Sequence, residues 1–267
     1  MTSLDGGAVA RFLEVLAEAP ARVLLLDYDG TLAPHREERD RAVPYPGVRR
    51  AMKQMLESGR TRVVVISGRT LASLRPLLGV EPPPELWGTH GWERLEPGGA
   101  AGVRDLSPAA AEALREASRA LSGAAFQSRV EVKPASVAVH TRGLAGAEAE
   151  RVLAAARGVW EQLTHEGWVE LHAFDGGVEL RVSGWDKGDA VRALLAEEPV
   201  GTAVAYLGDD LTDEDAFAVL EELAAAGRNA TLSTLVRAEP RPTEARAWLR
   251  PPEELLDFLT RWRDAEG

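Results

Sequence analysis

Three short runs of apolar residues in this chain each end abruptly in a polar loop that contains glycine. Residues 23–26 lead into Asp27-Tyr28-Asp29-Gly30, residues 63–66 into Ser67-Gly68-Arg69, and residues 203–207 into Gly208-Asp209-Asp210. Continuous apolar runs of this length are typical of parallel strands that are buried on both faces. Helical patterns at 8–18 and 48–58 lie between or beside them, so the sequence predicts an open, Rossmann-like α/β sheet. Ligands bind such sheets at the carboxyl ends of the strands, where all three loops would lie.

The stretch between the second and third of these strands has a different pattern. Segments 127–133 and 136–141 alternate around Pro134-Ala135, and segments 169–173 and 178–182 flank residues 174–177, so each pair predicts a hairpin. Helices are expected near 108–122 and 145–163. We therefore predict a smaller α+β cap domain at 107–183, inserted into a catalytic core formed by 1–106 and 184–267.

Charge and cysteine content exclude several classes of function. The chain carries 42 acidic against 31 basic residues, a formal net charge of −11, and has no basic block of the kind that binds nucleic acid. It has no cysteine, so disulfides and thiolate metal sites are excluded and a metal must be held by oxygen or histidine. No apolar run is long enough to span a bilayer, and we expect a cytoplasmic protein without membrane or nucleic-acid partners.

Asp27 and Asp29 are two carboxylates placed two residues apart at a predicted strand end. One such carboxylate can attack phosphorus as a nucleophile while the other transfers a proton. A polar turn after a strand is the structural alternative, because Asp and Gly are common in turns.

A second acidic segment, Gly208 to Asp215, follows the third predicted strand. Its carboxylates include Asp209, Asp210 and Asp213, and so many negative charges are costly together unless a cation neutralises them. Oxygen ligands of this kind suit Mg²⁺, whereas the glycine and glutamate positions of an EF-hand are absent. The alternative is a solvated acidic helix N-terminus, which would account for Glu214 and Asp215.

Two further elements could bind a phosphoryl group. Ser67, Gly68 and Arg69 offer a hydroxyl and backbone N–H groups at a predicted helix start, although Ser67 could instead cap the helix. Lys187 could offset negative charge on a nucleophile and a phosphoryl group, although an isolated lysine is usually a solvated surface residue.

In this order, the four elements resemble the motifs of the haloacid-dehalogenase superfamily: Asp27-x-Asp29-Gly30-Thr31, Ser67, Lys187, and Gly208-Asp209-Asp210. The resemblance implies that Asp27 is the nucleophile of an aspartyl-phosphate mechanism and that Asp29 is the general acid and then the general base. It also implies that Ser67 and Lys187 hold the phosphoryl group. Mg²⁺ would be bound by the Asp27 carboxylate, the Asp29 carbonyl and Asp209. Asp210 or Asp213 would complete or orient this ligand set.

Within the superfamily the chain is most similar to the trehalose-6-phosphate phosphatases. Asp-Tyr-Asp-Gly-Thr-Leu at 27–32 and Gly-Asp-Asp-Leu-Thr-Asp-Glu-Asp-Ala-Phe at 208–217 match motifs of that family. The resemblance places Glu131, Lys133 and Glu179 at sugar-binding positions of the cap. Without it, their alternation would indicate the solvent face of a small sheet. Residues 182–186 depart from the proline-containing segment that the family has before its Lys-Gly pair.

The resemblance implies a small-molecule sugar phosphate as substrate and Mg²⁺ as cofactor. It also makes a separate trehalose-6-phosphate synthase chain the expected protein partner. Two alternatives remain: a phosphatase for another sugar or glycosyl phosphate, such as sucrose phosphate or a mannosyl- or glucosyl-glycerate phosphate, and a non-catalytic regulatory domain. A regulatory domain would be expected to lose catalytic carboxylates, but Asp27, Asp29 and Asp209 are present.

Overall fold

The chain divides into two compact units in the computed structural model, which describes residues 7–174 and 176–266. Gly102–Trp185 form one unit, and the residues before and after them form the other. The predicted insertion was 107–183, so the observed unit begins at Gly102 instead of 107 and ends at Trp185 instead of 183. The short strand β5 (Ala101–Val103) contains the first of these two boundaries.

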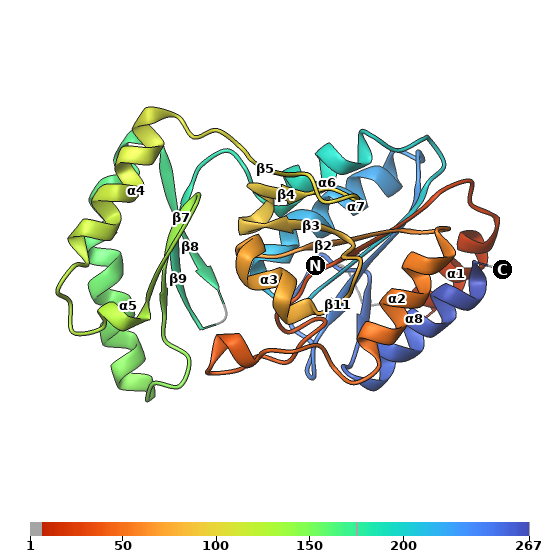
Figure 1. Ribbon diagram of the computed structural model, residues 1–267, viewed down its shortest axis with the longest axis horizontal. Helices are drawn as coiled ribbons and strands as arrows, with labels where there is room; N and C mark the ends of the chain where they lie inside the picture. Colours follow the sequence, from red (N-terminus) through yellow and green to blue (C-terminus); the bar gives the residue numbers. More distant parts are fainter. Residues whose placement is uncertain (1–6, 175, 267) are drawn as a thin grey trace. The chain divides into compact units, whose positions relative to one another are not determined.

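The larger unit is built on a mainly parallel sheet (Figure 1). Its strands follow the spatial order β12-β11-β10-β1-β2-β3-β4, and only the β3–β4 pair among these is antiparallel. The strand bounds are β1 (Arg22–Leu26), β2 (Arg62–Ile66), β3 (Glu85–Gly88), β4 (Glu93–Leu95), β10 (Ala203–Gly208), β11 (Ala230–Val236) and β12 (Ala247–Leu249). This order confirms the predicted α/β class and places β1 at the centre, between β10 and β2.

Helices cover both faces of this sheet (Figure 1). One face carries α1 (Ala8–Glu18), α2 (Val48–Ser58), α3 (Leu71–Leu78) and α8 (Glu253–Ala265), and the other carries α6 (Lys187–Leu195) and α7 (Glu214–Ala225). Leu24 and Leu26 of β1 belong to the core cluster under the first set of helices. Val23 and Leu25 point the other way and are also fully buried. Burial on both faces explains why the strand reads as a continuous apolar run.

Three short 3₁₀ helices of the larger unit lie in the segments that follow β1, β3 and β10 along the chain. They are η1 (Arg39–Arg41), η2 (Thr89–Gly91) and η5 (Leu211–Asp213). In η2, Thr89 and His90 both have positive φ, at 48° and 56°, a conformation that is uncommon for residues other than glycine.

The smaller unit is an antiparallel sheet of order β6-β7-β9-β8 with two helices along one side (Figure 1). Its elements are α4 (Pro108–Ala120), η3 (Gln127–Arg129), β6 (Val130–Lys133), β7 (Ser136–His140), α5 (Gly146–Trp160), η4 (Glu161–Glu166), β8 (Val169–Phe174) and β9 (Gly177–Val182). Both predicted hairpins are present, since β6 pairs with β7 and β8 with β9. Asp175, in the second predicted turn, lies outside the described residues.

Helix bounds in the smaller unit differ from the predicted ones at their carboxyl ends. The helix expected at 145–163 ends at Trp160 and continues as η4, and the segment expected to begin a strand at 127 is η3 until Arg129. Such shifts are common at element boundaries, where a tighter 3₁₀ turn satisfies the last backbone groups.

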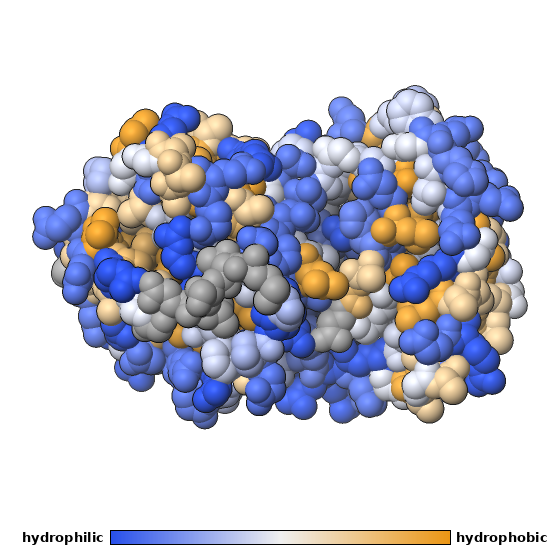
Figure 2. Space-filling model, turned by 180° about the vertical axis from the view of Figure 1, so that it is seen from behind, coloured by the Kyte–Doolittle hydropathy of each residue, from blue (hydrophilic) through white to orange (hydrophobic). Residues whose placement is uncertain are grey.

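No helix among the described residues is long and apolar enough to cross a membrane. On the face drawn in Figure 2, hydrophilic residues prevail and hydrophobic ones form small separate groups.

Candidate active site

The loop after β1 carries Asp27 at the middle of the sheet. Asp27 continues the strand by donating its N–H to the Leu207 carbonyl at 2.8 Å, and its side chain is buried. The chain then turns sharply, because the N–H groups of Leu32 and Ala33 both donate to the Tyr28 carbonyl at 3.0 Å. Gly30 has φ of +89°, which favours glycine at this turn.

Asp213 holds the acidic loop after β10 in place. Its Oδ2 accepts the backbone N–H groups of Asp209 and Asp210, each at 3.0 Å, while its Oδ1 accepts from Lys187 Nζ and the Tyr206 hydroxyl, each at 2.7 Å. Each carboxylate oxygen of Asp213 therefore accepts two hydrogen bonds. Asp210 has a local role, since its Oδ1 accepts the N–H of Leu211 at 2.7 Å and caps η5.

Lys187 is the first residue of α6 and lies between two carboxylates. Its Nζ is 2.6 Å from Asp27 Oδ1 and 2.7 Å from Asp213 Oδ1, and the residue is 2% exposed. A capping box between Asp186 and Asp189 fixes the start of the helix. Burial disfavours the ammonium form of Lys187, but the two carboxylates outweigh burial and raise its pKa. The lysine is therefore a fixed buried cation and not a solvated surface residue.

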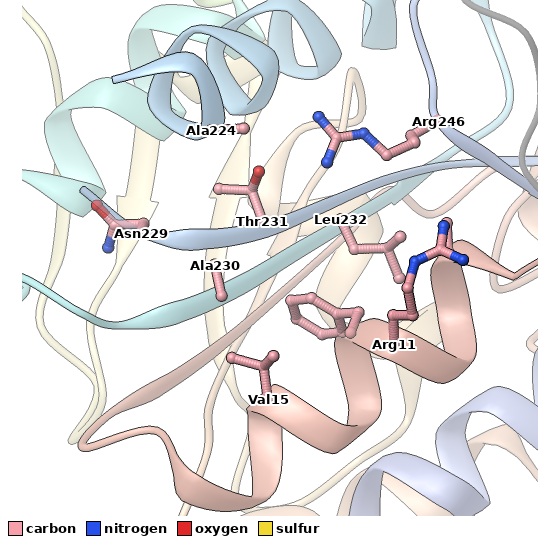
Figure 3. Close-up of a pocket in the computed structure, with 10 residues that line it drawn as sticks. Arg11, Val15, Ala224, Asn229, Ala230, Thr231, Leu232 and Arg246 are labelled. Carbon is pink, nitrogen blue, oxygen red and sulfur yellow. The ribbon is translucent and has the colours of Figure 1, made fainter. Parts of the chain in front are cut away.

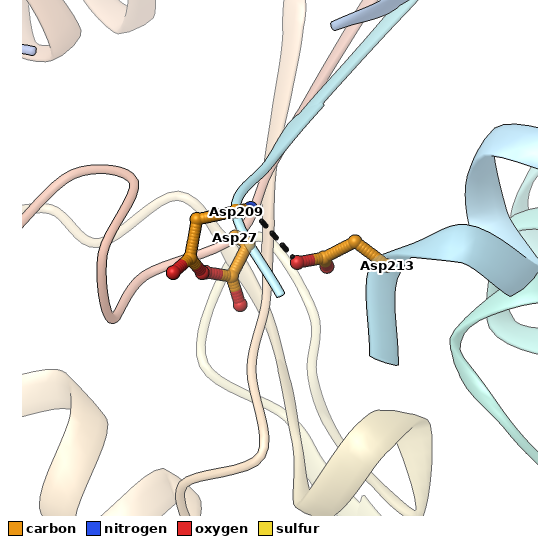
Figure 4. A group of neighbouring side chains, drawn as sticks. All are labelled: Asp27, Asp209 and Asp213. Carbon is orange, nitrogen blue, oxygen red and sulfur yellow. Dashed lines mark hydrogen bonds between the residues drawn. The ribbon is translucent and has the colours of Figure 1, made fainter. Parts of the chain in front are cut away.

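Asp27, Asp209 and Asp213 converge from the ends of neighbouring elements (Figure 4). One carboxylate oxygen from each lies within 4.8 Å of the others. Burial raises the pKa of both Asp27 and Asp209 well above the ordinary value, and neighbouring carboxylates add to the rise. A bound divalent cation would favour the ionised forms of these buried acids.

The oxygens of this group that lack a partner indicate where a cation fits. Among the described residues, Asp27 Oδ2 and Asp209 Oδ1 are buried and accept no hydrogen bond. Asp213 has no such oxygen. The donor set therefore fits Mg²⁺ held by Asp27 and Asp209, with Asp213 as the residue that orients the loop.

Ser67 and Gly68 lie in the loop after β2, the strand next to β1. Ser67 is buried, and it is not the helix cap, because Thr70 fills that position by accepting the Ser73 N–H. Gly68 faces the ring of His90, since a Cβ at Gly68 would lie 2.7 Å from two ring atoms. Capping therefore does not account for Ser67.

Arg69 makes contacts that its motif did not predict. Its N–H donates to Ser67 Oγ at 3.2 Å, so this backbone donor is engaged in the structure. Its guanidinium donates to both carboxylate oxygens of Asp29, at 2.6 and 2.8 Å, and to the Arg39 carbonyl at 2.8 Å. Asp29 is thus joined to the loop after β2.

Other neighbours of the acidic loop were not identified from the sequence. His35 Nε2 lies 2.8 Å from Asp209 Oδ2, Arg237 donates to the Asp209 carbonyl at 3.1 Å, and Arg241 donates to the Asp210 carbonyl at 2.8 Å. Tyr206 belongs to the same set through Asp213. None of these residues lies within a recognisable motif, although Tyr206 precedes the Gly-Asp-Asp segment by two positions.

The smaller unit brings its three predicted substrate-binding residues together on one face of its sheet. Glu131 and Glu179 are both paired with Ala138 of β7, so their side chains share a face. Lys133 Nζ is 2.7 Å from Glu179 Oε1 and 3.6 Å from Glu131 Oε2. Ser136 also donates to Glu179, at 2.6 Å. This is a connected polar cluster, which the simple alternative of a solvated sheet face does not predict.

A pocket of about 300 Å³ lies elsewhere in the larger unit (Figure 3). It is lined by residues of α1, including Arg11 and Val15, and by the first residues of β11. These are the amino ends of the sheet strands, whereas Asp27 and Asp209 follow carboxyl ends. None of the predicted site residues lines this pocket.

The fold is the one found in haloacid-dehalogenase-like proteins. The chain has the same fold as a haloacid-dehalogenase-like hydrolase from B. subtilis, with a TM-score of 0.59 at 14% identity over 90% of this chain and 99% of that one. The match to the C. albicans trehalose-6-phosphate phosphatase C-terminal domain has a TM-score of 0.81 at 23% identity, over 99% and 98% of the two chains.

Sequence comparison identifies the family. Residues 25–251 match the family model described as trehalose-phosphatase. A trehalose-phosphate phosphatase of Mycobacterium tuberculosis is 35% identical over 77% of this chain, and a probable trehalose-phosphate phosphatase of Oryza sativa subsp. japonica is 31% identical over 94%. The chain belongs to the trehalose-phosphatase family.

The relatives differ in how much of their length this chain spans. The alignment covers 73% of the rice protein and 52% of the M. tuberculosis phosphatase. It covers 15% of a second M. tuberculosis protein, described as an uncharacterized glycosyl hydrolase, which is 35% identical over 73% of this chain.

Proposed function

We propose that this protein is a Mg²⁺-dependent phosphatase that hydrolyses trehalose 6-phosphate to trehalose and phosphate through an aspartyl-phosphate on Asp27. One observation carries the proposal: Asp27, Lys187 and Asp209 meet in a buried cluster. Two of its oxygens, Asp27 Oδ2 and Asp209 Oδ1, accept no hydrogen bond from the described part of the chain and suit a hard cation. Phosphoryl transfer depends mainly on positioning and neutralisation of charge, and this cluster offers both.

Asp27 would attack phosphorus while the bond from phosphorus to the sugar oxygen breaks. Lys187 holds Asp27 Oδ1 at 2.6 Å and so fixes the nucleophile and balances charge on the phosphoryl group. Ser67 would donate to a phosphoryl oxygen. Mg²⁺, held by Asp27, Asp209 and the Asp29 carbonyl, would supply further charge neutralisation.

Asp29 would give a proton to the departing sugar oxygen and then remove one from the water that hydrolyses the aspartyl-phosphate. Each oxygen of Asp29 accepts one hydrogen bond from Arg69 in the structure and keeps a second lone pair that can carry the transferred proton. The second step regenerates Asp27 and releases phosphate.

Glu131, Lys133 and Glu179 would recognise the sugar through charge-assisted hydrogen bonds to its hydroxyl groups. Their clustering on one face of the cap sheet supports this role. Family membership and the identity with trehalose-phosphate phosphatases support trehalose 6-phosphate as the substrate.

Phosphate release should be measured with the purified protein across trehalose 6-phosphate, sucrose phosphate, and mannosyl- and glucosyl-glycerate phosphates, with and without Mg²⁺. The highest kcat/KM is expected for trehalose 6-phosphate. Preference for another member of the panel would reassign the substrate. No Mg²⁺-dependent hydrolysis of any member would favour a non-catalytic regulatory domain.

A further inference from the structure

We propose that His35 is a positioning residue that holds one carboxylate oxygen of Asp209, so that Asp209 offers a single oxygen to the cation and the site prefers Mg²⁺ to Ca²⁺. The inference deepens the proposed function and rests on the cation site described there.

All polar atoms of Asp209 except one have a hydrogen-bond partner. Its N–H donates to Asp213 at 3.0 Å, and its carbonyl accepts from Arg237 at 3.1 Å. Its Oδ2 lies 2.8 Å from His35 Nε2, and His35 is the donor in the ionised form of Asp209 that binds a cation, because a carboxylate only accepts. Only Oδ1 is buried without a hydrogen-bond partner among the described residues.

Gly30 provides the space in which His35 reaches Asp209. A Cβ at Gly30 would lie 2.0 Å from Asp209 Oδ2 and 2.7 Å from His35 Nε2. Any side chain there would displace the pair, so the turn after Asp27 and the His35 contact are built together. The Arg237 guanidinium, 3.9 Å from the same Oδ2, adds positive charge on that side of the carboxylate.

The engaged oxygen limits how Asp209 can bind a cation. Mg²⁺ requires near-octahedral geometry and is satisfied by one oxygen from each carboxylate plus waters. Ca²⁺ takes six to eight oxygens and often uses both oxygens of one carboxylate. With Oδ2 bound to His35, Asp209 offers the ligand that suits Mg²⁺ and withholds the second oxygen that Ca²⁺ would use.

Removal of His35 should therefore change cation choice as well as cation affinity. Loss of a hydrogen-bond partner of a metal ligand typically lowers metal affinity by about 10- to 100-fold. For Ca²⁺ this loss should be offset, because Oδ2 becomes available as a second ligand. The ratio of the Mg²⁺ Kd to the Ca²⁺ Kd should then rise about tenfold.

The test is calorimetric titration of the metal-free full chain with Mg²⁺ and, separately, Ca²⁺, in the absence of substrate. His35→Phe and His35→Ala remove the donor, and His35→Gln keeps an N–H at a similar reach. His165→Gln, at an exposed histidine of the other unit, is the matched control. Circular dichroism establishes that each variant is folded, and the alanine variant replaces the phenylalanine variant if the larger ring prevents folding.

We expect both donor-free variants to bind Mg²⁺ about tenfold or more weakly with an increased Mg²⁺/Ca²⁺ Kd ratio, and the glutamine variant to resemble the unaltered protein. Three results would overturn the role of His35 and leave the phosphatase proposal intact. They are unchanged Kd values in the donor-free variants, an equal loss of affinity for both cations, and a glutamine variant that binds Mg²⁺ as weakly as the donor-free ones. Absence of Mg²⁺ binding to the unaltered protein would instead count against the proposed function itself.

Discussion

Arg69 donates to both carboxylate oxygens of Asp29, with its Nε 2.6 Å from Oδ2 and its Nη2 2.8 Å from Oδ1. The arginine is 3% exposed, and its guanidinium lies 5.6 Å from the centre of the Tyr28 ring. Two-point pairing of this kind fixes direction as well as distance. The loop after β2 therefore sets the position of the residue proposed to transfer protons.

Replacement of Arg69 by Lys should impair turnover in a way that depends on the leaving group. Lysine keeps the charge but loses the two-point geometry, so Asp29 is less well placed to protonate a sugar oxygen. We expect kcat/KM for trehalose 6-phosphate to fall at least about tenfold, within the range of general acid catalysis. Hydrolysis of p-nitrophenyl phosphate, whose leaving group departs without a proton, should fall much less. Arg75→Lys, at an exposed ion pair, is the control. Equal losses of kcat/KM on both esters would argue against a role of Arg69 in placing Asp29.

The central parts of the site could be predicted because each rests on local sequence. Helices α1 and α2 have the predicted bounds, since their apolar residues recur with helical spacing. Asp27 and Asp209 follow apolar runs that pack in the middle of the sheet, and strand ends of a parallel sheet meet at one edge.

The roles of Asp210 and Asp213 could not be separated in that way. Both are acidic residues of one short loop, and the choice depends on which side chain turns back to the backbone N–H groups of Asp209 and Asp210. The His35 contact was also beyond sequence reasoning, because it requires the turn at Gly30 to bring a distant loop against Asp209. In the cap, the alternating sequence pattern predicted that Glu131 and Glu179 point out from a sheet. Whether they lie on the same face depends on the strand register, which the sequence pattern does not give.

Asp27→Asn should abolish turnover of every phosphate ester while the protein remains folded. The amide has nearly the shape of the carboxylate but cannot form the aspartyl-phosphate. Phosphate release should fall to background, and thermal unfolding should remain cooperative. A steady-state rate close to that of the unaltered protein would exclude the covalent mechanism.

Lys187→Met should destabilise the fold even in the absence of substrate. The change removes the cation between Asp27 and Asp213 and leaves two buried carboxylates without it. Breaking a buried ion pair in this way costs roughly 3–5 kcal/mol, measured as the free energy of unfolding in urea. Lys53→Met, at a lysine whose side chain is 61% exposed, should change stability by no more than about 0.5 kcal/mol. Similar values for the two variants would contradict the structural role of Lys187.

Glu197 should stabilise the larger unit at neutral pH and lose this effect in acid. Hydrogen bonds from Arg94, opposed by burial and helped by Arg62, lower its pKa to about 2. A carboxyl whose pKa is lower in the folded than in the unfolded state contributes stability above its unfolded pKa and loses it as pH falls toward the folded value. Glu197→Gln should therefore be less stable than the unaltered protein near neutral pH, and the difference should shrink below about pH 4.5. A difference that stays constant with pH, or one equal to that of the exposed control Glu57→Gln, would refute the assignment.

The last prediction separates recognition of the sugar from the chemistry at phosphorus. Glu131 suits this test better than Glu179, because Glu179 is buried and accepts from Lys133 and Ser136, so its loss would also disturb the cap. Glu131→Gln keeps the size of the side chain and removes its charge.

If Glu131 accepts hydrogen bonds from sugar hydroxyls, kcat/KM for trehalose 6-phosphate should fall about tenfold, which corresponds to roughly 1.4 kcal/mol. Hydrolysis of p-nitrophenyl phosphate, which has no sugar, should hardly change. Glu170→Gln, at an exposed glutamate of β8 on the opposite edge of the same sheet, should leave both rates unchanged. Because binding energy from a remote group can appear in kcat as well as in KM, both constants should be measured for each ester. A loss of equal size on both esters would make Glu131 a residue that supports the fold, and no loss on either would return it to the solvated face of the cap sheet.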